Sequence, residues 1–305
     1  MVHGASGVVG QAVVRALVER DEVRATVRRP SSAETLRSMG AKVAVLDPDD
    51  GDDLAGILRG VVTLVHLVGG PNQLDDDDVF RANHGSTVTA LRAAAAAGVP
   101  RFVFVSVPEA STDADDPFIR AKGLAEEAVV RSGLEHAILR CAPVYGLGGI
   151  WFTAVVQGAA AEPPVTIGDP SREVAPLFAD DLAQVVAAID GWSPEVAGAW
   201  CLEGPDVVRA SELAALLRGD ATVARHLEGE GPLGELLGVP VSASAAAYLR
   251  AAGRARGDDA AEVFGVPRTS LREGLHRVAS RAGATDGSAL LTSPPANGSP
   301  SRGPG

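Results

Sequence analysis

Residues 4–10 read Gly-Ala-Ser-Gly-Val-Val-Gly, and this glycine-rich turn constrains the fold more than any other stretch of the chain. Three glycines at this spacing let a strand turn sharply into a helix, because side chains would block the close approach of the two elements. The first N–H groups of the helix then face one anion, such as a pyrophosphate. The residues expected to form this cradle are Gly4, Ser6, Gly7, Val8, Val9 and Gly10.

Only Met1, Val2 and His3 precede the turn, which is about half the length of an ordinary strand. We therefore expect the first strand to begin before residue 1, with the true start several residues upstream. An intact mass of the native protein that corresponds to a start at Met1 would contradict this expectation.

Short apolar runs alternate with amphipathic stretches in the first half of the chain, as in β–α units on a parallel sheet. Expected strands after the turn are 23–27, 43–46, 64–68, 102–107 and 136–140. Expected helices are 11–19, a short one capped by Ser31 or Ser32, 79–97 and 117–131. Six strands in chain order, with helices between them, predict an α/β fold with a doubly wound parallel sheet of the Rossmann type.

The alternation loosens after Tyr145, where we expect strands at 174–178 and 200–202 and helices from Asp180 and over 271–281. We therefore assign residues 1–145 to a Rossmann domain and residues 146–281 to a smaller substrate or cap lobe, partly interleaved with it. Residues 282–305 consist mainly of Gly, Ser, Pro, Ala, Thr and Asn, which bury too little surface to fold. This stretch is predicted to be a disordered tail.

Charge narrows the classes of partner. The net charge of −12 argues against nucleic acid or an anionic membrane as the main partner, and no apolar run is long enough to span a bilayer. The acidic runs 47–53 and 75–78 lack the spacing of a calcium loop and are expected to be solvated loops, and no Cys/His spacing indicates zinc. Cys141 and Cys201 are isolated, which favours a reducing compartment and a cytoplasmic protein.

The end of the second strand indicates which cofactor binds. A carboxylate at this point favours a free ribose 2′-hydroxyl, whereas arginine suits a 2′-phosphate. The chain carries Arg28 and Arg29 there and no carboxylate, so NADP(H) is favoured over NAD(H). The alternative is that both arginines are simply solvated.

Two later strand ends carry further candidates. Asp47 closes the third strand, where a carboxylate can accept from an adenine amino group or serve as a turn residue before Pro48. Val68 and Gly69 follow the fourth strand, and glycine there permits close approach to the nucleotide ribose. A simple loop is the alternative for Gly69.

Several of these stretches are similar to the extended and atypical short-chain dehydrogenase/reductase superfamily. They include V-R-R-P at 27–30, H-L-V-G-G at 66–70 and the run from Ala94 to Ser106. The chain looks like the NmrA-like branch and the nucleotide-binding accessory subunit of respiratory complex I. The likeness covers roughly residues 1–217 and implies NAD(P) binding.

The resemblance also implies a catalytic arrangement that this chain only partly keeps. Active members place Y-x-x-x-K on a helix and a serine at the end of the fifth strand. Lys122 matches the lysine, Ser106 or Ser111 stands in the serine region, and Phe118 replaces the tyrosine. The tyrosine passes a proton to or from the substrate oxygen and the lysine holds the nicotinamide ribose, so a phenyl ring leaves the proton transfer without a donor.

Candidate substrate residues are Phe118 and Tyr145. Tyr145 follows the sixth strand, where the family's substrate cleft begins, and it is a candidate substitute for the missing tyrosine as well as a candidate packing residue. His66 and His84 also lie near the ligand side, and His66 fits a core residue inside an apolar strand. Asn83 occupies a place where the family has a structural asparagine.

Two functions of different classes fit these residues. One is an NADPH-dependent oxidoreductase acting on a small quinone, enone or carbonyl compound. The other is a non-catalytic nucleotide-binding redox sensor or accessory subunit, which Phe118 favours. A sugar-nucleotide epimerase needs the missing tyrosine and ranks third. The expected partner is a small-molecule substrate or effector, and a homodimer or a protein partner stays open.

Overall fold

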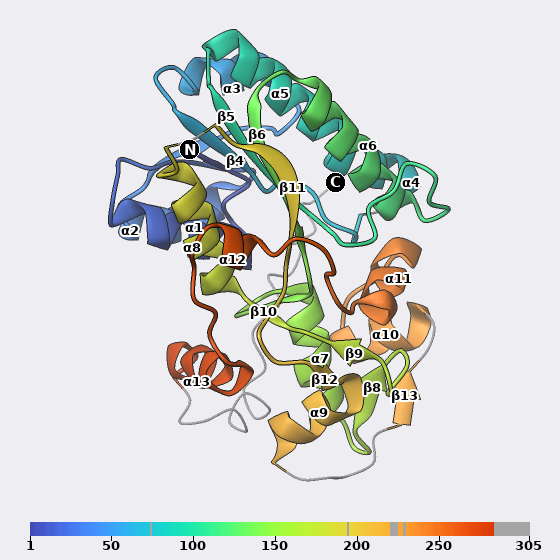
Figure 1. Ribbon diagram of the computed structural model, residues 1–305. Coiled ribbons are helices and arrows are strands. Elements are labelled where there is room, and N and C mark those ends of the chain that lie inside the picture. Colours follow the sequence, from blue (N-terminus) through green and yellow to red (C-terminus); the bar gives the residue numbers. More distant parts are fainter. Residues whose placement is uncertain (74, 194, 220–224, 228–229, 284–305) are drawn as a thin grey trace.

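The computed structural model describes residues 1–305 except 74, 194, 220–224, 228–229 and 284–305. Its centre is a parallel sheet of seven strands in the order β11-β6-β5-β4-β1-β2-β3 (Figure 1). The strand bounds are Val2–His3 (β1), Arg24–Val27 (β2), Lys42–Val45 (β3), Thr63–His66 (β4), Arg101–Ser106 (β5), Glu135–Cys141 (β6) and Ala197–Leu202 (β11). The predicted doubly wound sheet is therefore confirmed, and its strand order reverses between β1 and β4.

Helices cover both faces of this sheet. One face packs against α1 (Val8–Val18), α2 (Ala33–Ser38), α8 (Ala179–Asp190) and α12 (Ala260–Val263). The other face packs against α3 (Gly51–Ile57), α5 (Ser86–Ala97) and α6 (Pro117–Arg131). In β5, Val103 belongs to the first core, and Phe102 and Phe104 belong to the second. Burial on both faces explains why the central strands are almost continuously apolar.

The seventh strand differs from the prediction of six strands in chain order. β11 pairs in parallel with β6 over its whole length, from Ala197 opposite His136 to Leu202 opposite Cys141. Its first residues alternate between exposed and half-buried positions, as expected for an edge strand, so it lacks the continuous apolar run of its neighbours. Residues beyond 145 thus return to the sheet, as α8 and α12 do.

The remaining elements form a second core beside the carboxyl edge of the sheet (Figure 1). Its helices are α7 (Ile150–Ala160), α9 (Ala210–Arg218), α10 (Glu230–Leu237), α11 (Ala243–Ala251) and α13 (Leu271–Arg281). Its strand pairs are β7 (Val144–Tyr145) with β10 (Leu177–Phe178), β9 (Glu173–Val174) with β12 (Val208–Arg209), and β8 (Val165–Ile167) with β13 (Arg225–Leu227). We call this part the lobe.

The two acidic runs lead into helices, which corrects part of the prediction of solvated loops: residues 47–49 lie in a turn outside any helix, whereas residues 52–53 and 76–78 are helical. The Asp50 carboxylate accepts from the Asp53 amide at 3.1 Å and caps α3. The Asp75 carboxylate accepts from the Asp78 amide at 2.8 Å and caps α4 (Asp76–Phe80). Carboxylates satisfy the free N–H groups and the dipole at a helix N-terminus, so acidic residues gather there.

The long helix predicted over 79–97 is interrupted. It consists of α4, a π-helical turn η2 (Arg81–Gly85) and α5. Most of the predicted tail, residues 284–305, lies outside the described residues. Within the described part of the chain, no helix is long and apolar enough to cross a membrane.

Candidate nucleotide and substrate site

The three glycines of the first turn each meet a different geometric requirement. Gly4 has φ +85°, and a Cβ on it would lie 2.9 Å from the Val68 amide nitrogen. A Cβ on Gly10 would lie 2.5 Å from the Ala5 Cα, so α1 packs on the turn only with glycine there. Gly7, the N-cap of α1, has nothing within 4 Å of its Cβ position and no side-chain cap. The N-terminus of α1 therefore faces open space of the kind that a diphosphate fills.

The turn is held from below by a buried polar pair. The Thr26 hydroxyl accepts from the Gly4 amide at 3.2 Å and lies 2.7 Å from His3 Nδ1. The Ala5 amide donates to the Thr26 carbonyl at 2.9 Å. Burial lowers the pKa of His3 to about 4, so its imidazole is neutral near pH 7. The backbone of the turn is thus fixed before any ligand arrives.

Arg28 and Arg29 follow β2, the strand next to β1 in the sheet. Both are exposed, and neither guanidinium group has a hydrogen-bond or ion-pair partner among the described residues. Their guanidinium groups are available for an anion beside the turn. Asp47 is also exposed, and its carboxylate accepts from the Asp49 amide at 3.0 Å, which closes the turn after β3.

Asn83 holds the loop that follows β4. Its Oδ1 accepts from the Gly70 amide at 2.9 Å, and its Nδ2 donates to the carbonyls of Gly70 at 3.0 Å and Val79 at 2.8 Å. Gly69 has φ +116°, and a Cβ there would collide with Asn83 Oδ1. Val68 is half-buried and packs over Gly4. The buried Asn83 lies in the π turn, a deviation that occurs frequently at functional sites.

Lys122 and Ser106 lie together where β5 ends. Lys122, on α6, donates from Nζ to the Val105 carbonyl at 2.9 Å and stands 4.7 Å from the centre of the Phe104 ring. It is buried, and this burial lowers its pKa to about 8. Ser106 Oγ is buried without a hydrogen-bond partner among the described residues. An amine with one partner and a hydroxyl with none fit the hydroxyl groups of a bound ribose.

Phe118 lies one helical turn before Lys122 on the same helix. Asp116 caps α6 by accepting from the Phe118 amide at 2.9 Å and the Ile119 amide at 3.0 Å. The Phe118 ring is 2% exposed and belongs to an apolar cluster with Val79 and Val107. The structure thus brings residues 106, 118 and 122 together, and the ring of Phe118 has no proton to transfer.

The other aromatic and imidazole candidates lie in packed surroundings. Tyr145 is buried in the lobe core, where its ring stacks 5.3 Å from Phe178 and its hydroxyl, next to Gly274, has no hydrogen-bond partner among the described residues. His66 is buried beside His3, lies 3.2 Å from the Thr87 hydroxyl, and has a pKa well below its usual value, chiefly because of burial. His84 is half-buried, with its ring 4.9 Å from Phe80.

An open cavity of about 510 Å³ lies between the sheet edge and the lobe. Pro108 and Glu109, just after β5, form one wall, and the rest comes from the lobe. The lobe residues that line it are Arg172, Glu173, Ala251, Gly253, Arg254 and Arg256. This cavity has room for a small organic molecule.

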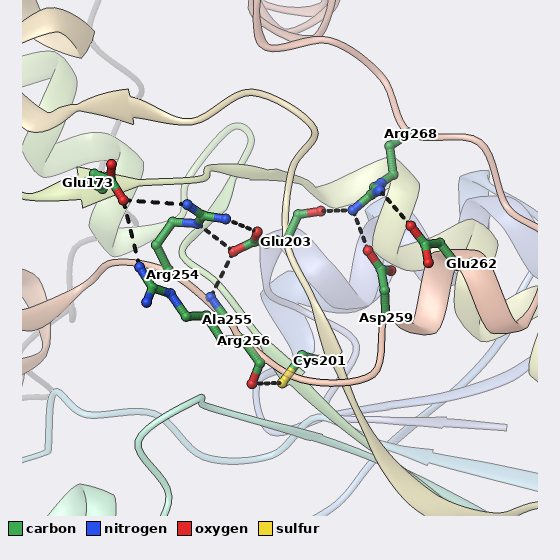
Figure 2. Close-up of polar contacts among 9 residues, drawn as sticks. All are labelled: Glu173, Cys201, Glu203, Arg254, Ala255, Arg256, Asp259, Glu262 and Arg268. Atoms are coloured by element: carbon green, nitrogen blue, oxygen red, sulfur yellow. Dashed lines mark hydrogen bonds and ion pairs between the residues drawn. The ribbon is translucent and has the colours of Figure 1, made fainter.

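Ion pairs fix the arginine wall of this cavity (Figure 2). Arg254 binds both carboxylate oxygens of Glu203, at 2.9 Å and 2.5 Å. Arg254 and Arg256 also approach the Glu173 carboxylate, at 3.5 Å and 3.8 Å. Among the described residues, no cluster of three or more His, Cys, Asp or Glu side chains offers a metal site.

Comparison with known proteins agrees with this geometry. Residues 4–145 match a family model described as NAD(P)H-binding. The mitochondrial NADH dehydrogenase (ubiquinone) 1 alpha subcomplex subunit 9 of Arabidopsis thaliana is 27% identical over 228 residues, 71% of this chain and 56% of that protein. The photosystem II assembly factor Ycf39 of Cyanophora paradoxa is 27% identical over 186 residues, 60% of this chain and 56% of that protein. The matches thus span about half the length of these relatives.

Solved structures share the fold over nearly the whole chain. MoeE5, in complex with UDP-glucose and NAD, has a TM-score of 0.70 and 20% identity over 96% of this chain and 98% of its own. UDP-glucose 4-epimerase of Thermotoga maritima has a TM-score of 0.68 and 17% identity over 91% of this chain and 96% of its own. Residues 4–145 therefore carry an NAD(P)-binding domain of the Rossmann type. The resemblance to extended short-chain dehydrogenases/reductases is confirmed, including the likeness to the complex I subunit.

Proposed function

We propose that the chain binds NADP(H) and acts as an oxidoreductase on a small quinone, enone or carbonyl compound in the cavity beside Glu109. The observation that carries the proposal is the open space at Gly7 beside two unpaired arginines, Arg28 and Arg29. A free helix N-terminus takes a diphosphate, and paired guanidinium groups take a 2′-phosphate. NADP(H) presents both groups.

Residues along the sheet edge, from the arginines after β2 to the end of β5, would hold the cofactor. The N-terminus of α1 binds the diphosphate, and the loop at Val68 and Gly69, held by Asn83, lies against the ribose. Lys122 and Ser106 orient the ribose at the nicotinamide end. Asp47 is proposed to contact the adenine through its second carboxylate oxygen. When bound, NADPH supplies the hydride, and the chain supplies position and charge.

A second candidate is a non-catalytic nucleotide-binding protein, such as a redox sensor of the NmrA-like kind or an accessory subunit. Phe118 favours it, because the ring cannot pass a proton. The similar proteins named as a complex I subunit and an assembly factor also favour it. In that case the nucleotide, or an effector in the cavity, controls a protein partner or a homodimer. A cytoplasmic location remains part of the proposal.

The test is a calorimetric titration of the purified chain with NADPH and with NADH, followed by oxidation of bound NADPH across a quinone, enone and carbonyl panel. We expect one NADPH per chain, bound at least tenfold more tightly than NADH, and turnover on part of the panel. Tight binding without turnover would favour the non-catalytic candidate. Binding of neither nucleotide would contradict both.

A further inference from the structure

Phe118 does not face an empty site, because a tyrosine from the lobe covers it. The ring of Tyr248, on α11, lies edge-on to the Phe118 ring with centres 5.8 Å apart and planes at 83°. Tyr248 is half-buried and joins the same apolar cluster as Phe118. The chain has only two tyrosines, and the other, Tyr145, lies in the lobe core. A phenol is thus present beside the phenyl ring.

The Tyr248 hydroxyl is unengaged within the described part of the chain, where no hydrogen-bond partner for it occurs. The titratable groups near it are Glu109, in the cavity wall, and Cys141, at the end of β6. Burial, first, and then these two groups raise the pKa of Tyr248, so it stays a neutral donor. Cys141 is also within the electrostatic reach of Lys122. Through its ring contact with Phe118, Tyr248 therefore lies beside the helix that carries Lys122, and Glu109 of the cavity wall is among the groups that act on it.

The loop after β4 anchors α11, which fixes where Tyr248 lies. Ser242, the N-cap of α11, donates from Oγ to the Pro71 carbonyl at 3.0 Å and from its amide to Asn72 Oδ1 at 3.1 Å. Asn72 in turn donates to the Pro240 carbonyl at 3.4 Å. Ala251, one turn beyond Tyr248, lines the cavity together with Glu109. The helix that carries Tyr248 thus contacts the loop after β4 at its start and lines the cavity at its end.

Carbonyl reduction needs a proton as well as a hydride. Phe118 lies one helical turn before Lys122, and its phenyl ring cannot donate a proton. We propose that Tyr248 is the proton donor of this site, its hydroxyl serving the chemistry that Phe118 cannot. This inference rests on the proposed oxidoreductase function. Tyr248 would donate its proton to the carbonyl oxygen, where the C=O π pair forms the O–H bond, while bound NADPH would supply the hydride for the new C–H bond at the carbonyl carbon and be left as NADP⁺. The phenolate is then reprotonated by water entering the cavity beside Glu109.

Two tyrosines make a direct test possible without activity. In protein labelled with [4-¹³C]tyrosine, NMR gives one signal for Tyr145 and one for Tyr248, and Tyr248→Phe assigns them. We expect NADP⁺ at saturation to shift the Tyr248 signal and leave the Tyr145 signal in place, since the cationic ring would lie near Tyr248. Binding proved by calorimetry with an unmoved Tyr248 signal, or with Tyr145 moving instead, overturns the inference while the cofactor proposal stands. Absence of NADP⁺ binding overturns both.

Steady-state kinetics provide a second test of Tyr248 as the proton donor. Tyr248→Phe should lower kcat about 100-fold or more, in the range of general acid catalysis, and change the NADPH Kd by less than about threefold. Adding Phe118→Tyr to that variant should restore part of the lost turnover. A Tyr248→Phe variant with full kcat, or a loss of kcat that follows only from weaker NADPH binding or unfolding, would contradict the role of proton donor.

Discussion

The nucleotide cradle and the Phe118 position lie at the same edge of the sheet, and they are built in opposite ways. At Gly7 the chain leaves space open, and no side chain caps the helix that begins there. At Phe118 a ring fills the space and a tyrosine from the lobe covers it. The cradle needs only residues 4–10 and the strands below them, whereas the second position combines α6 with α11. The diphosphate cradle is therefore a local property of this chain, and the proposed chemistry depends on distant segments meeting.

The largest expected effect is on NADPH affinity and comes from a substitution that fills the open space at Gly7. Gly7→Asp adds a carboxylate where a diphosphate would lie, so we expect the NADPH Kd to rise at least about 100-fold, because juxtaposed like charges cost several kcal/mol. The protein should not lose stability, since Asp is as good an N-cap as Gly or better by a few tenths of a kcal/mol. Calorimetry and thermal unfolding measure the two effects.

The control for this variant is Ser38→Asp, which adds the same charge at an exposed position of α2 and should leave the Kd unchanged. A Gly7→Asp variant that binds NADPH normally would show that the nucleotide does not use this turn.

The next expected effect comes from Asn83, which holds the loop after β4 through hydrogen bonds. Asn83→Ala removes three hydrogen bonds and leaves the Gly70 amide without its acceptor, so the free energy of unfolding should fall by about 3 kcal/mol. Asn72→Ala is the control, because Asn72 is exposed and water replaces its partners, with an expected loss below about 1 kcal/mol. Equal losses in the two variants, measured by urea unfolding, would mean that Asn83 does not hold the loop.

The arginine pair tests the choice of cofactor. Replacing both Arg28 and Arg29 by serine should weaken NADPH binding by about 2 kcal/mol, roughly 30-fold, and leave NADH binding within a factor of about two. Arg37→Ser, another exposed arginine, should change neither Kd. Parallel loss of NADPH and NADH affinity in the double variant would remove the 2′-phosphate assignment.

The smallest expected effect concerns Lys122, which lies near Phe118. It is the pH dependence of the contribution that Lys122 makes to stability. Because folding lowers its pKa from 10.5 to about 8, the unfolded chain binds more protons between those values, and its contribution to stability rises with pH. From pH 8 to pH 9, the stability of the wild type relative to Lys122→Met should rise by about 1 kcal/mol. Chemical unfolding at both pH values measures this difference.

Lys42→Met, which removes an exposed lysine, is the control for the loss of a lysine as such. A flat difference for Lys122→Met would mean that the Lys122 amine is hydrated in the folded protein.

Local patterns in the sequence predicted much of this architecture. α6 spans the predicted 117–131, since Asp116 caps it, Pro117 occupies the first turn and Gly133 follows its end. The glycine turn and the succession of the first six strands along the chain follow from equally local signals. The acidic runs carried a local signal as well, because Asp50 and Asp75 are good N-caps, but their charge was interpreted as solvation.

What the sequence did not reveal depends on contacts between distant residues. The π turn exists where Asn83 reaches the loop at Gly70, and β11 becomes a sheet strand only by pairing with β6. Tyr248 lies 130 positions after Phe118 in the chain, so no spacing rule connects the two. A tyrosine followed by Leu249 in a helix of small residues is typical of packing, and only the contact of its ring with Phe118 shows that α11 meets α6.

A crystal structure of the chain with bound NADPH tests the central claim most directly. The account predicts the diphosphate on the amides at Gly7 and Val8, the 2′-phosphate between Arg28 and Arg29, and the nicotinamide ribose within hydrogen-bond distance of Lys122 Nζ. A nucleotide bound elsewhere, or one whose 2′-phosphate points away from both arginines, would contradict it.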